Sequence, residues 1–223
     1  MEYRMLLVGP SLIAGSVLTL PPVVNADAQP QTITINTSQM RTGLAPRDFA
    51  FTLTGDGPVS AWKVVADPTA TAEKAIAQTS ADATAHRYLL AVYEPLAATS
   101  IEVSAHFKPV GGTVDQAAGI AVRFLTPDDY YVVRADVLED DVRLYRVVNG
   151  KRQEIKGAKT KVSANQWHTL GIRAEADRFV VSFDCKSLFA AEDETFTKPG
   201  NVALWTEADS LTHFDSISIT PLD

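Results

Sequence analysis

Arginine, aspartate and aromatic residues alternate along the middle of the sequence, and this combination of side chains can bind sugars. Aromatic rings stack on the apolar face of a pyranose, whereas guanidinium groups and carboxylates form paired hydrogen bonds with hydroxyls. Most of these residues lie in the segments 130–136 and 143–145. The candidate ligand-binding residues are Arg123, Arg134, Asp136, Arg143, Tyr145 and Trp205.

A hairpin register predicts that these side chains share one face, because successive side chains of a strand point to opposite faces. The register pairs Leu125 with Tyr130 and places Arg134 opposite Ala121. The alternative is a solvated sheet face on which the two arginines 134 and 143 only form cross-strand ion pairs with Asp136. The opposite face collects apolar residues and predicts a core: Ile120, Val122, Phe124, Tyr131, Val133, Val137, Val142 and Leu144.

Catalysis requires an acid and a base near the bound sugar, and the candidates are Asp136, Glu102 and His106. Glucanases of family 16 carry a Glu-x-Asp-x-x-Glu run on one strand, and the sequence has none. The nearest approach is Asp136 with Glu139 and Asp140, but the last two fall in a predicted turn. The sequence also lacks a Gly-x-Ser-x-Gly elbow and zinc-ligand spacing of His and Cys. No complete catalytic constellation is therefore predicted.

Short segments of alternating apolar residues, separated by Gly, Pro, Asn and Asp, follow one another from Asp48 onward. This pattern is typical of an all-β sandwich or barrel. Only the segment 71–78 has a helix-like pattern, and Asn149-Gly150 is a strong hairpin signal. We predict one β-sandwich domain over 48–223, preceded by a linker or edge strand over 29–47. The predicted strands from residue 101 onward are Ile101–Phe107, Gly119–Leu125, Tyr130–Val137, Val142–Val148, Trp167–Arg173, Phe179–Asp184, Val202–Thr206 and His213–Ile219.

Residues 1–28 predict a signal peptide, with Arg4 before an apolar stretch and small residues at its end. A membrane anchor is the alternative, but prolines interrupt the apolar stretch, so we expect no membrane span in the mature chain. The protein is therefore predicted to be periplasmic or secreted. Its formal net charge is −7 without a Lys/Arg cluster, which argues against nucleic-acid binding. Cys185 is the single cysteine, so no internal disulfide can form.

Several motifs between Phe49 and the C-terminus resemble a known family. They are Asp115–Ile120, Tyr130–Ala135, Arg143–Arg146, Gly150–Arg152, Gln166–Leu170, Ala203–Thr206 and His213–Asp215. Together they are similar to exported bacterial proteins with a laminin-G-like domain, related to 3-keto-disaccharide hydrolase-like domains. The resemblance implies a concanavalin A-like jelly roll whose concave sheet holds carbohydrate. The family usually has Asn at positions 136 and 140, and Gly in place of Cys185, which predicts a rearranged turn with an exposed thiol.

The resemblance leaves three functions open. The leading hypothesis is a glycan-recognition domain without established catalysis. The second is a glycoside hydrolase or lyase that acts on 3-keto-disaccharides or related glycans, and the third is a structural envelope protein. Folds of this class often bind calcium between their terminal strands, for which Asp215, and more distantly Asp48, are candidate ligands.

Overall fold

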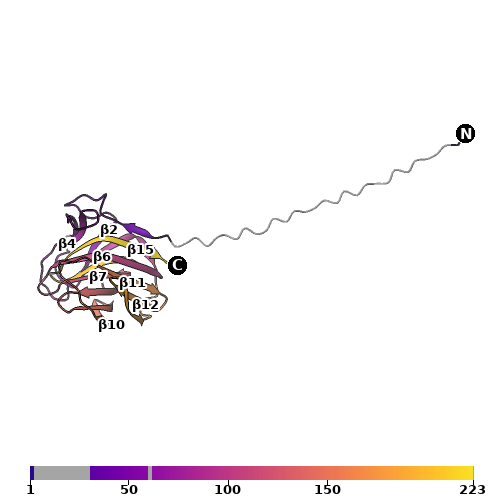
Figure 1. Cartoon of the computed structure of the whole chain (residues 1–223). Coiled ribbons are helices and arrows are strands. Elements are labelled where there is room, and N and C mark those ends of the chain that lie inside the picture. Colours follow the sequence, from indigo (N-terminus) through magenta and orange to yellow (C-terminus); the bar gives the residue numbers. More distant parts are fainter. Residues whose placement is uncertain (3–30, 60–61, 223) are drawn as a thin grey trace.

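Strand-forming segments fold into two antiparallel sheets that pack face to face (Figure 1). This computed structural model describes residues 1–2, 31–59 and 62–222, in which no helix occurs and therefore none that could span a membrane. Sheet A contains, in order, β13 (Lys186–Glu192), β12 (Arg178–Phe183), β11 (His168–Glu175), β6 (Ile101–Gly111), β15 (Leu211–Pro221), β4 (Lys74–Gln78) and β3 (Trp62–Ala66), with β1 (Ile33–Ile35) paired to β15. Sheet B contains β10 (Lys151–Lys159), β9 (Asp141–Val148), β8 (Asp129–Asp136), β7 (Ala117–Thr126), β14 (Gly200–Glu207), β5 (Tyr88–Ala98) and β2 (Phe49–Thr54).

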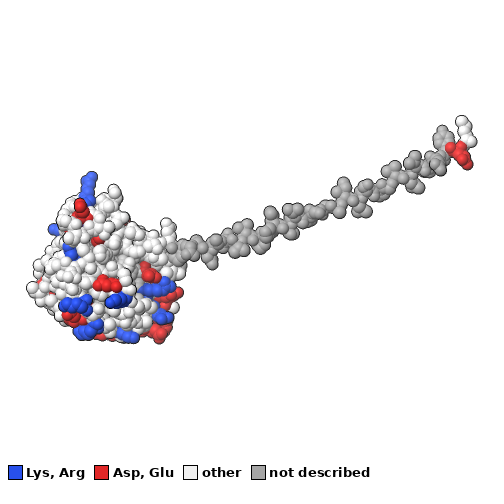
Figure 2. Space-filling model, viewed as in Figure 1, with Lys and Arg blue, Asp and Glu red and all other residues white. Residues whose placement is uncertain are grey.

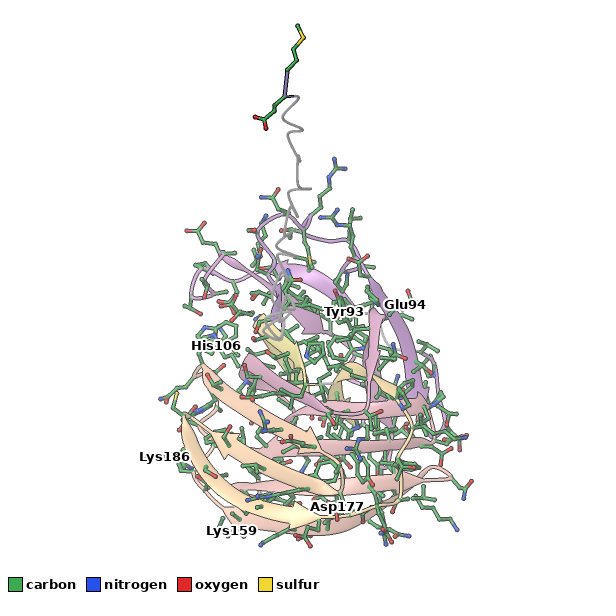
Figure 3. All side chains as sticks on the ribbon, turned by 90° about the vertical axis from the view of Figure 1, so that its right-hand side faces the viewer. Tyr93, Glu94, His106, Lys159, Asp177 and Lys186 are labelled. Carbon is green, nitrogen blue, oxygen red and sulfur yellow. The ribbon has the colours of Figure 1, made fainter. Side chains whose placement is uncertain are left out.

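The hydrophobic core lies between the inner faces of the two sheets. Strand β6 buries Ile101, Val103, Ala105 and Phe107 and turns Glu102 and His106 outward, as its alternation predicts. Burial of each large apolar side chain contributes about 1.5–3 kcal/mol. The all-β, concanavalin A-like sandwich predicted from the sequence is thus confirmed. In Figure 3, His106 of sheet A and Glu94 of sheet B lie on opposite sides of the molecule.

Two details of the predicted strands are wrong. The helix-like segment 71–78 ends in strand β4, which pairs with β3 and β15, so tertiary pairing overrides its local pattern. In sheet B, Arg134 pairs with Gly119 rather than with Ala121, a shift of two residues from the predicted register. Because side chains repeat every two residues, this shift leaves the side chains of β8 on their predicted faces.

The turn between β12 and β13 is a regular two-residue hairpin, because Phe183 pairs directly with Lys186. Asp184 and Cys185 both have positive φ, 46° and 62°. The Asp184 carboxylate fixes this turn by binding His168 Nδ1 at 2.8 Å and accepting a hydrogen bond from the Thr169 amide at 2.9 Å. Cys185 is exposed as predicted, but the predicted rearrangement of the turn is wrong. The turn keeps the backbone geometry that glycine favours, with a cysteine in it.

Charged residues of both signs are mixed over the part of the surface that carries them in Figure 2, and this face has no extended basic patch. The arrangement agrees with the low share of Lys and Arg in the sequence. It offers no track for a phosphate backbone on this side of the molecule.

Candidate functional site

The outer face of sheet B carries a second apolar cluster, separate from the core between the sheets. At its centre Trp205 is fully buried, with its ring 5.3 Å from Tyr88, and its Nε1 donates to the Tyr130 hydroxyl at 3.3 Å. Aromatic rings packed on the solvent side of a sheet are typical of ligand-binding faces. The cluster comprises Tyr88, Leu90, Val92, Ala117, Ala121, Tyr130, Val132, Tyr145, Val147, Ala203 and Trp205.

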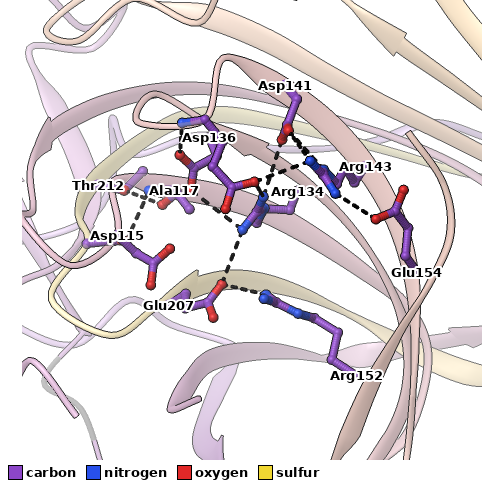
Figure 4. A network of polar contacts seen from close by, with 12 residues as sticks. Asp115, Ala117, Arg134, Asp136, Asp141, Arg143, Arg152, Glu154, Glu207 and Thr212 are labelled. Atoms are coloured by element: carbon purple, nitrogen blue, oxygen red, sulfur yellow. Dashed lines mark hydrogen bonds and ion pairs between the residues drawn. The ribbon is translucent and has the colours of Figure 1, made fainter. Parts of the chain in front are cut away.

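Arg134 is the centre of a buried ionic network beside this cluster (Figure 4). Its Nη2 donates to Glu139 Oε2 at 2.7 Å and to Asp141 Oδ1 at 3.3 Å, and its Nη1 lies 3.6 Å from Asp136 Oδ2 and from Glu207 Oε2. Four carboxylates thus surround one guanidinium. Removing either partner of such a buried pair leaves an uncompensated charge, so the network holds β8, β9 and β14 in place.

Arg143 extends the network toward the edge of the sheet. It binds Asp141 Oδ2 through Nη2 and Glu154 Oε2 through Nη1, both at 2.7 Å. Burial favours the protonated form of Asp141, but hydrogen bonds from Arg143 and Lys159 outweigh it and lower the pKa of this carboxyl. Arg143 is partly exposed and can also contact a ligand.

Asp136 mainly supports the backbone. Its Oδ1 accepts a hydrogen bond from the Glu139 amide at 2.9 Å, which closes the turn between β8 and β9, while the buried Oδ2 has no hydrogen-bond partner among the residues that the structure describes. Burial raises the pKa of Asp136, although Arg134 opposes this effect. Asp136 is fully buried, so a ligand meets its neighbours first.

Asp115 faces the same network from the loop before β7. The buried Asp209 carboxylate anchors this loop by accepting hydrogen bonds from the amides of residues 113, 114 and 115 at 2.7–3.0 Å. Burial, together with the charges of Glu207 and Asp136, raises the pKa of Asp115 to about 7. Asp115 therefore titrates near neutral pH and can donate or accept a hydrogen bond.

Arg152 lies over the aromatic cluster. Its guanidinium carbon is 4.6 Å from the Tyr145 ring, 4.9 Å from Tyr88 and 5.9 Å from Trp205. Its Nη1 donates to Glu207 Oε2 at 2.5 Å. Cation–π contacts with three rings and one ion pair hold this side chain in a single position.

A β-bulge in β7 reverses the predicted positions of Arg123 and Phe124. Arg123 has φ 48° and turns inward, where it donates to the carbonyl oxygens of Thr99, Phe196 and Ala176 at 2.8, 2.9 and 2.5 Å. The predicted place of Arg123 on the polar face is therefore wrong. Gly200 permits the bulge, because a Cβ there would lie 2.5 Å from the Arg123 carbonyl carbon.

Phe124 consequently lies on the outer face instead of in the core, where the sequence pattern placed it. Its partly exposed ring packs against Tyr130, with ring centres 5.8 Å apart. It lines a groove of about 430 Å³ together with Ala50, Thr52 and Val92, and with the polar residues Glu94 and Asn201. An aromatic ring, small apolar residues and a few polar groups form this groove, which is the composition of many sugar-binding surfaces.

More than half of the chain matches the model of a known protein family. The family model of the galactocerebrosidase C-terminal lectin domain matches residues 90–222. The chain belongs to this lectin-domain family. The match spans β5 to β15 with the exception of the first residues of β5, and so includes the bulge, the ionic network and Arg152. A search of curated proteins found no match.

Solved structures share the sandwich of this lectin-domain chain at low sequence identity. A carbohydrate-binding module, CBM66 from Bacillus subtilis, has a TM-score of 0.60 and 18% identity, over 76% of this chain and 94% of its own. Domain 4 of AbnA, an arabinanase from Geobacillus stearothermophilus solved with arabinotriose, has a TM-score of 0.56 and 13% identity, over 87% and 94%. A Bacillus licheniformis β-glucanase has a TM-score of 0.53 and 11% identity, over 89% of this chain and 100% of its own. These similarities establish the fold.

The three catalytic candidates do not meet in the lectin-domain fold. Glu102 and His106 lie on the outer face of sheet A, whereas Asp136 lies on the outer face of sheet B. Glu102 pairs with Arg173 at 2.9 Å, and the His106 ring stacks on Trp167 with centres 4.8 Å apart. The sequence offered these three residues as an acid and a base near one bound sugar, and the structure places them on two different sheets, so together they cannot serve one bound sugar.

The candidate calcium ligand Asp215 is buried on sheet A. Its Oδ2 accepts a hydrogen bond from the Thr71 amide at 2.8 Å and lies 3.4 Å from His106 Nδ1. Within the part of the chain that the structure describes, no group of three or more His, Cys, Asp or Glu side chains is placed to hold a metal ion. Calcium binding through Asp215 or Asp48 stays a prediction.

The structure thus gathers Arg134, Asp136, Arg143, Tyr145 and Trp205 on the outer face of sheet B and removes Arg123 from it. Sequence reasoning missed Asp115, Phe124, Arg152 and Glu207. Alternation from Trp205 could have placed Glu207 on the same face, and Arg152 follows the Asn-Gly hairpin by two residues. The position of Phe124 had no signal in local alternation, because a bulge breaks that alternation.

Proposed function

We propose that this protein binds carbohydrate on the outer face of sheet B, in the groove beside Phe124. The observation that carries the proposal is a partly exposed aromatic ring in an open groove on the outer face of sheet B. The galactocerebrosidase family model is that of a lectin domain, and two of the similar structures are a carbohydrate-binding module and an arabinanase domain solved with arabinotriose. These relatives support the same ligand class.

The groove and the network have different parts in this proposal. The ring of Phe124 stacks against a sugar, while Asn201 and Glu94 accept hydrogen bonds from its hydroxyls. Three residues beneath this face are fully buried and do not contact the sugar directly, namely Arg134, Asp136 and Trp205. They support the side chains around them. The proposal concerns binding and leaves the reaction predicted from 3-keto-disaccharide hydrolases as a separate hypothesis.

Binding to a panel of neutral and acidic oligosaccharides that includes arabinotriose tests the proposal, first on an array and then by titration calorimetry. We expect Phe124→Ala to weaken the binding of the best panel member about tenfold, because loss of a stacked ring costs about 1.4 kcal/mol. Phe124→Tyr should keep most of the affinity. Trp167→Ala, which removes a partly exposed ring just before β11 of sheet A, serves as the control. An affinity unaffected by Phe124→Ala, or no binding to any member, would contradict the proposal.

Export to the periplasm or the medium is a second part of the proposal. It rests on the signal-peptide pattern of residues 1–28, of which residues 3–28 lie outside the described part of the chain. Expression of the full chain in a Gram-negative host, followed by fractionation and mass determination, tests it. Processing near residue 28 and recovery outside the cytoplasm are the expected results, and a full-length cytoplasmic chain would refute it.

A further inference from the structure

A second pocket lies on the outer face of sheet B, on the other side of the turn 126–129 from the groove. Its volume is about 430 Å³, and it is lined by His86, Tyr88, Gly150, Lys151 and Arg152. The Gly150 amide donates to the Asp128 carbonyl at 2.9 Å, which places the β9–β10 hairpin against this turn, while Pro127 of the same turn lines the groove. The two hollows therefore flank one structural element.

The pocket has the charge of an anion site. Two of its five described lining residues, Lys151 and Arg152, are cations, a third is a histidine, and none is an aspartate or glutamate. Lys151 is exposed, so its ammonium group is free to turn toward a ligand. Tyr88 contributes one wall that is apolar except for its hydroxyl.

Arg152 is held ready to bind a planar anion. The rings of Tyr88 and Tyr145 fix its guanidinium, and within the described residues only its Nη1 has a hydrogen-bond partner, Glu207. Its side chain is 17% exposed, so Nε and Nη2 can donate to a group in the pocket.

We propose that this pocket binds the carboxylate of a hexuronic acid, while the rest of the saccharide lies toward Phe124. The inference rests on the carbohydrate binding proposed above and specifies its ligand class. A guanidinium fork matches the two oxygens of a carboxylate, and Lys151 adds a second positive charge. With a neutral sugar in the pocket, the guanidinium and ammonium groups would hydrogen-bond to water instead of to a carboxylate. The pocket therefore binds an acidic saccharide more tightly than a neutral one.

The test compares oligosaccharides that end in glucuronate or galacturonate with the methyl ester of each, because esterification removes the charge and keeps the sugar. We expect the wild-type protein to bind the acids at least tenfold more tightly than the esters at low salt, and this preference should shrink as salt rises. Arg152→Gln should abolish the preference. Lys151→Gln, at an exposed position, should reduce it about threefold without affecting the fold, and Arg173→Gln on sheet A should leave it unchanged.

The outcomes separate this inference from the proposed function. Equal affinity for acids and esters, with binding still sensitive to Phe124→Ala, overturns the hexuronate site and leaves carbohydrate binding intact. A preference that survives both Arg152→Gln and Lys151→Gln also overturns the site. Stronger binding of sulfated neutral sugars than of uronates would overturn the assignment to a carboxylate. No binding of any acid, ester or neutral sugar overturns both proposals.

Discussion

Replacement of Asp115 by asparagine removes one titrating group from the polar network and leaves its shape almost unchanged. The pKa of Asp115 is about 7, compared with 3.8 for an ordinary aspartate, because the carboxyl is buried beside Glu207 and Asp136. A folded-state pKa above the unfolded value means that the stability contributed by this group is fully present below about pH 4. It is lost as the pH rises through 7.

The size of the effect follows from this difference in pKa. Between pH 5 and pH 7 the unfolded carboxyl is ionised and the native one is protonated, so the free energy of unfolding falls by about 1.36 kcal/mol per pH unit. The largest loss in the free energy of unfolding between pH 5 and pH 7 is therefore about 2.7 kcal/mol. Asp115 is partly exposed, and solvent screening reduces the expected loss to roughly 1–1.5 kcal/mol.

Urea unfolding at pH 5 and pH 8, followed by tryptophan fluorescence, measures this loss. We expect the free energy of unfolding of Asp115→Asn, relative to the wild type, to be roughly 1–1.5 kcal/mol higher at pH 8 than at pH 5. Glu194→Gln removes an exposed charge elsewhere and should show the same difference from wild type at both pH values. If Asp115→Asn also shows a constant difference, Asp115 is ionised throughout and the reasoning is refuted.

Three further substitutions test the fold that supports the site by chemical denaturation. Cys185→Gly should raise the free energy of unfolding by about 0.5–1 kcal/mol, because glycine accepts the φ of 62° without strain, and a decrease would contradict this reading of the turn. Arg123→Met should lower it by about 3 kcal/mol, since one buried and two partly buried carbonyls lose this donor, and a loss under 1 kcal/mol would show that water replaces it. Asp209→Asn should cost about 1–3 kcal/mol by releasing the loop that carries Asp115, and unchanged stability would refute its anchoring role.

The alternation of side chains in the sequence predicted most residues of the outer face of sheet B. This prediction holds even when the register is wrong by two residues, because a shift of two residues does not change the face of a side chain. The two-residue shift between β7 and β8 changed the β7 partners of Arg134 and Asp136, yet both side chains stayed on their predicted side. A bulge adds a single residue and therefore reverses the sides. This is why Arg123 and Phe124 are exchanged relative to the prediction, and the groove could not be found from local sequence.

The positions of the three catalytic candidates show a second limit of prediction from sequence, which concerns the sheet to which each strand belongs. Glu102, His106 and Asp136 each occupy an outward position in their own strands, as their patterns predict. Alternation indicates the face of a strand but not the sheet to which the strand belongs. The assignment of β6 to sheet A depends on long-range pairing with β11 and β15, which one sequence does not reveal.

The complete burial of Trp205 on the outer side of sheet B has a consequence for motion. Apolar clusters cover both faces of the sheet along β7, β8 and β14, so water reaches the backbone amides of these strands only when the whole sheet opens. We expect them to exchange their hydrogens more slowly than the amides of β1 and β10 at the margins of the sheets. A ligand therefore meets a preorganised surface, and little of its binding energy is spent on ordering the protein.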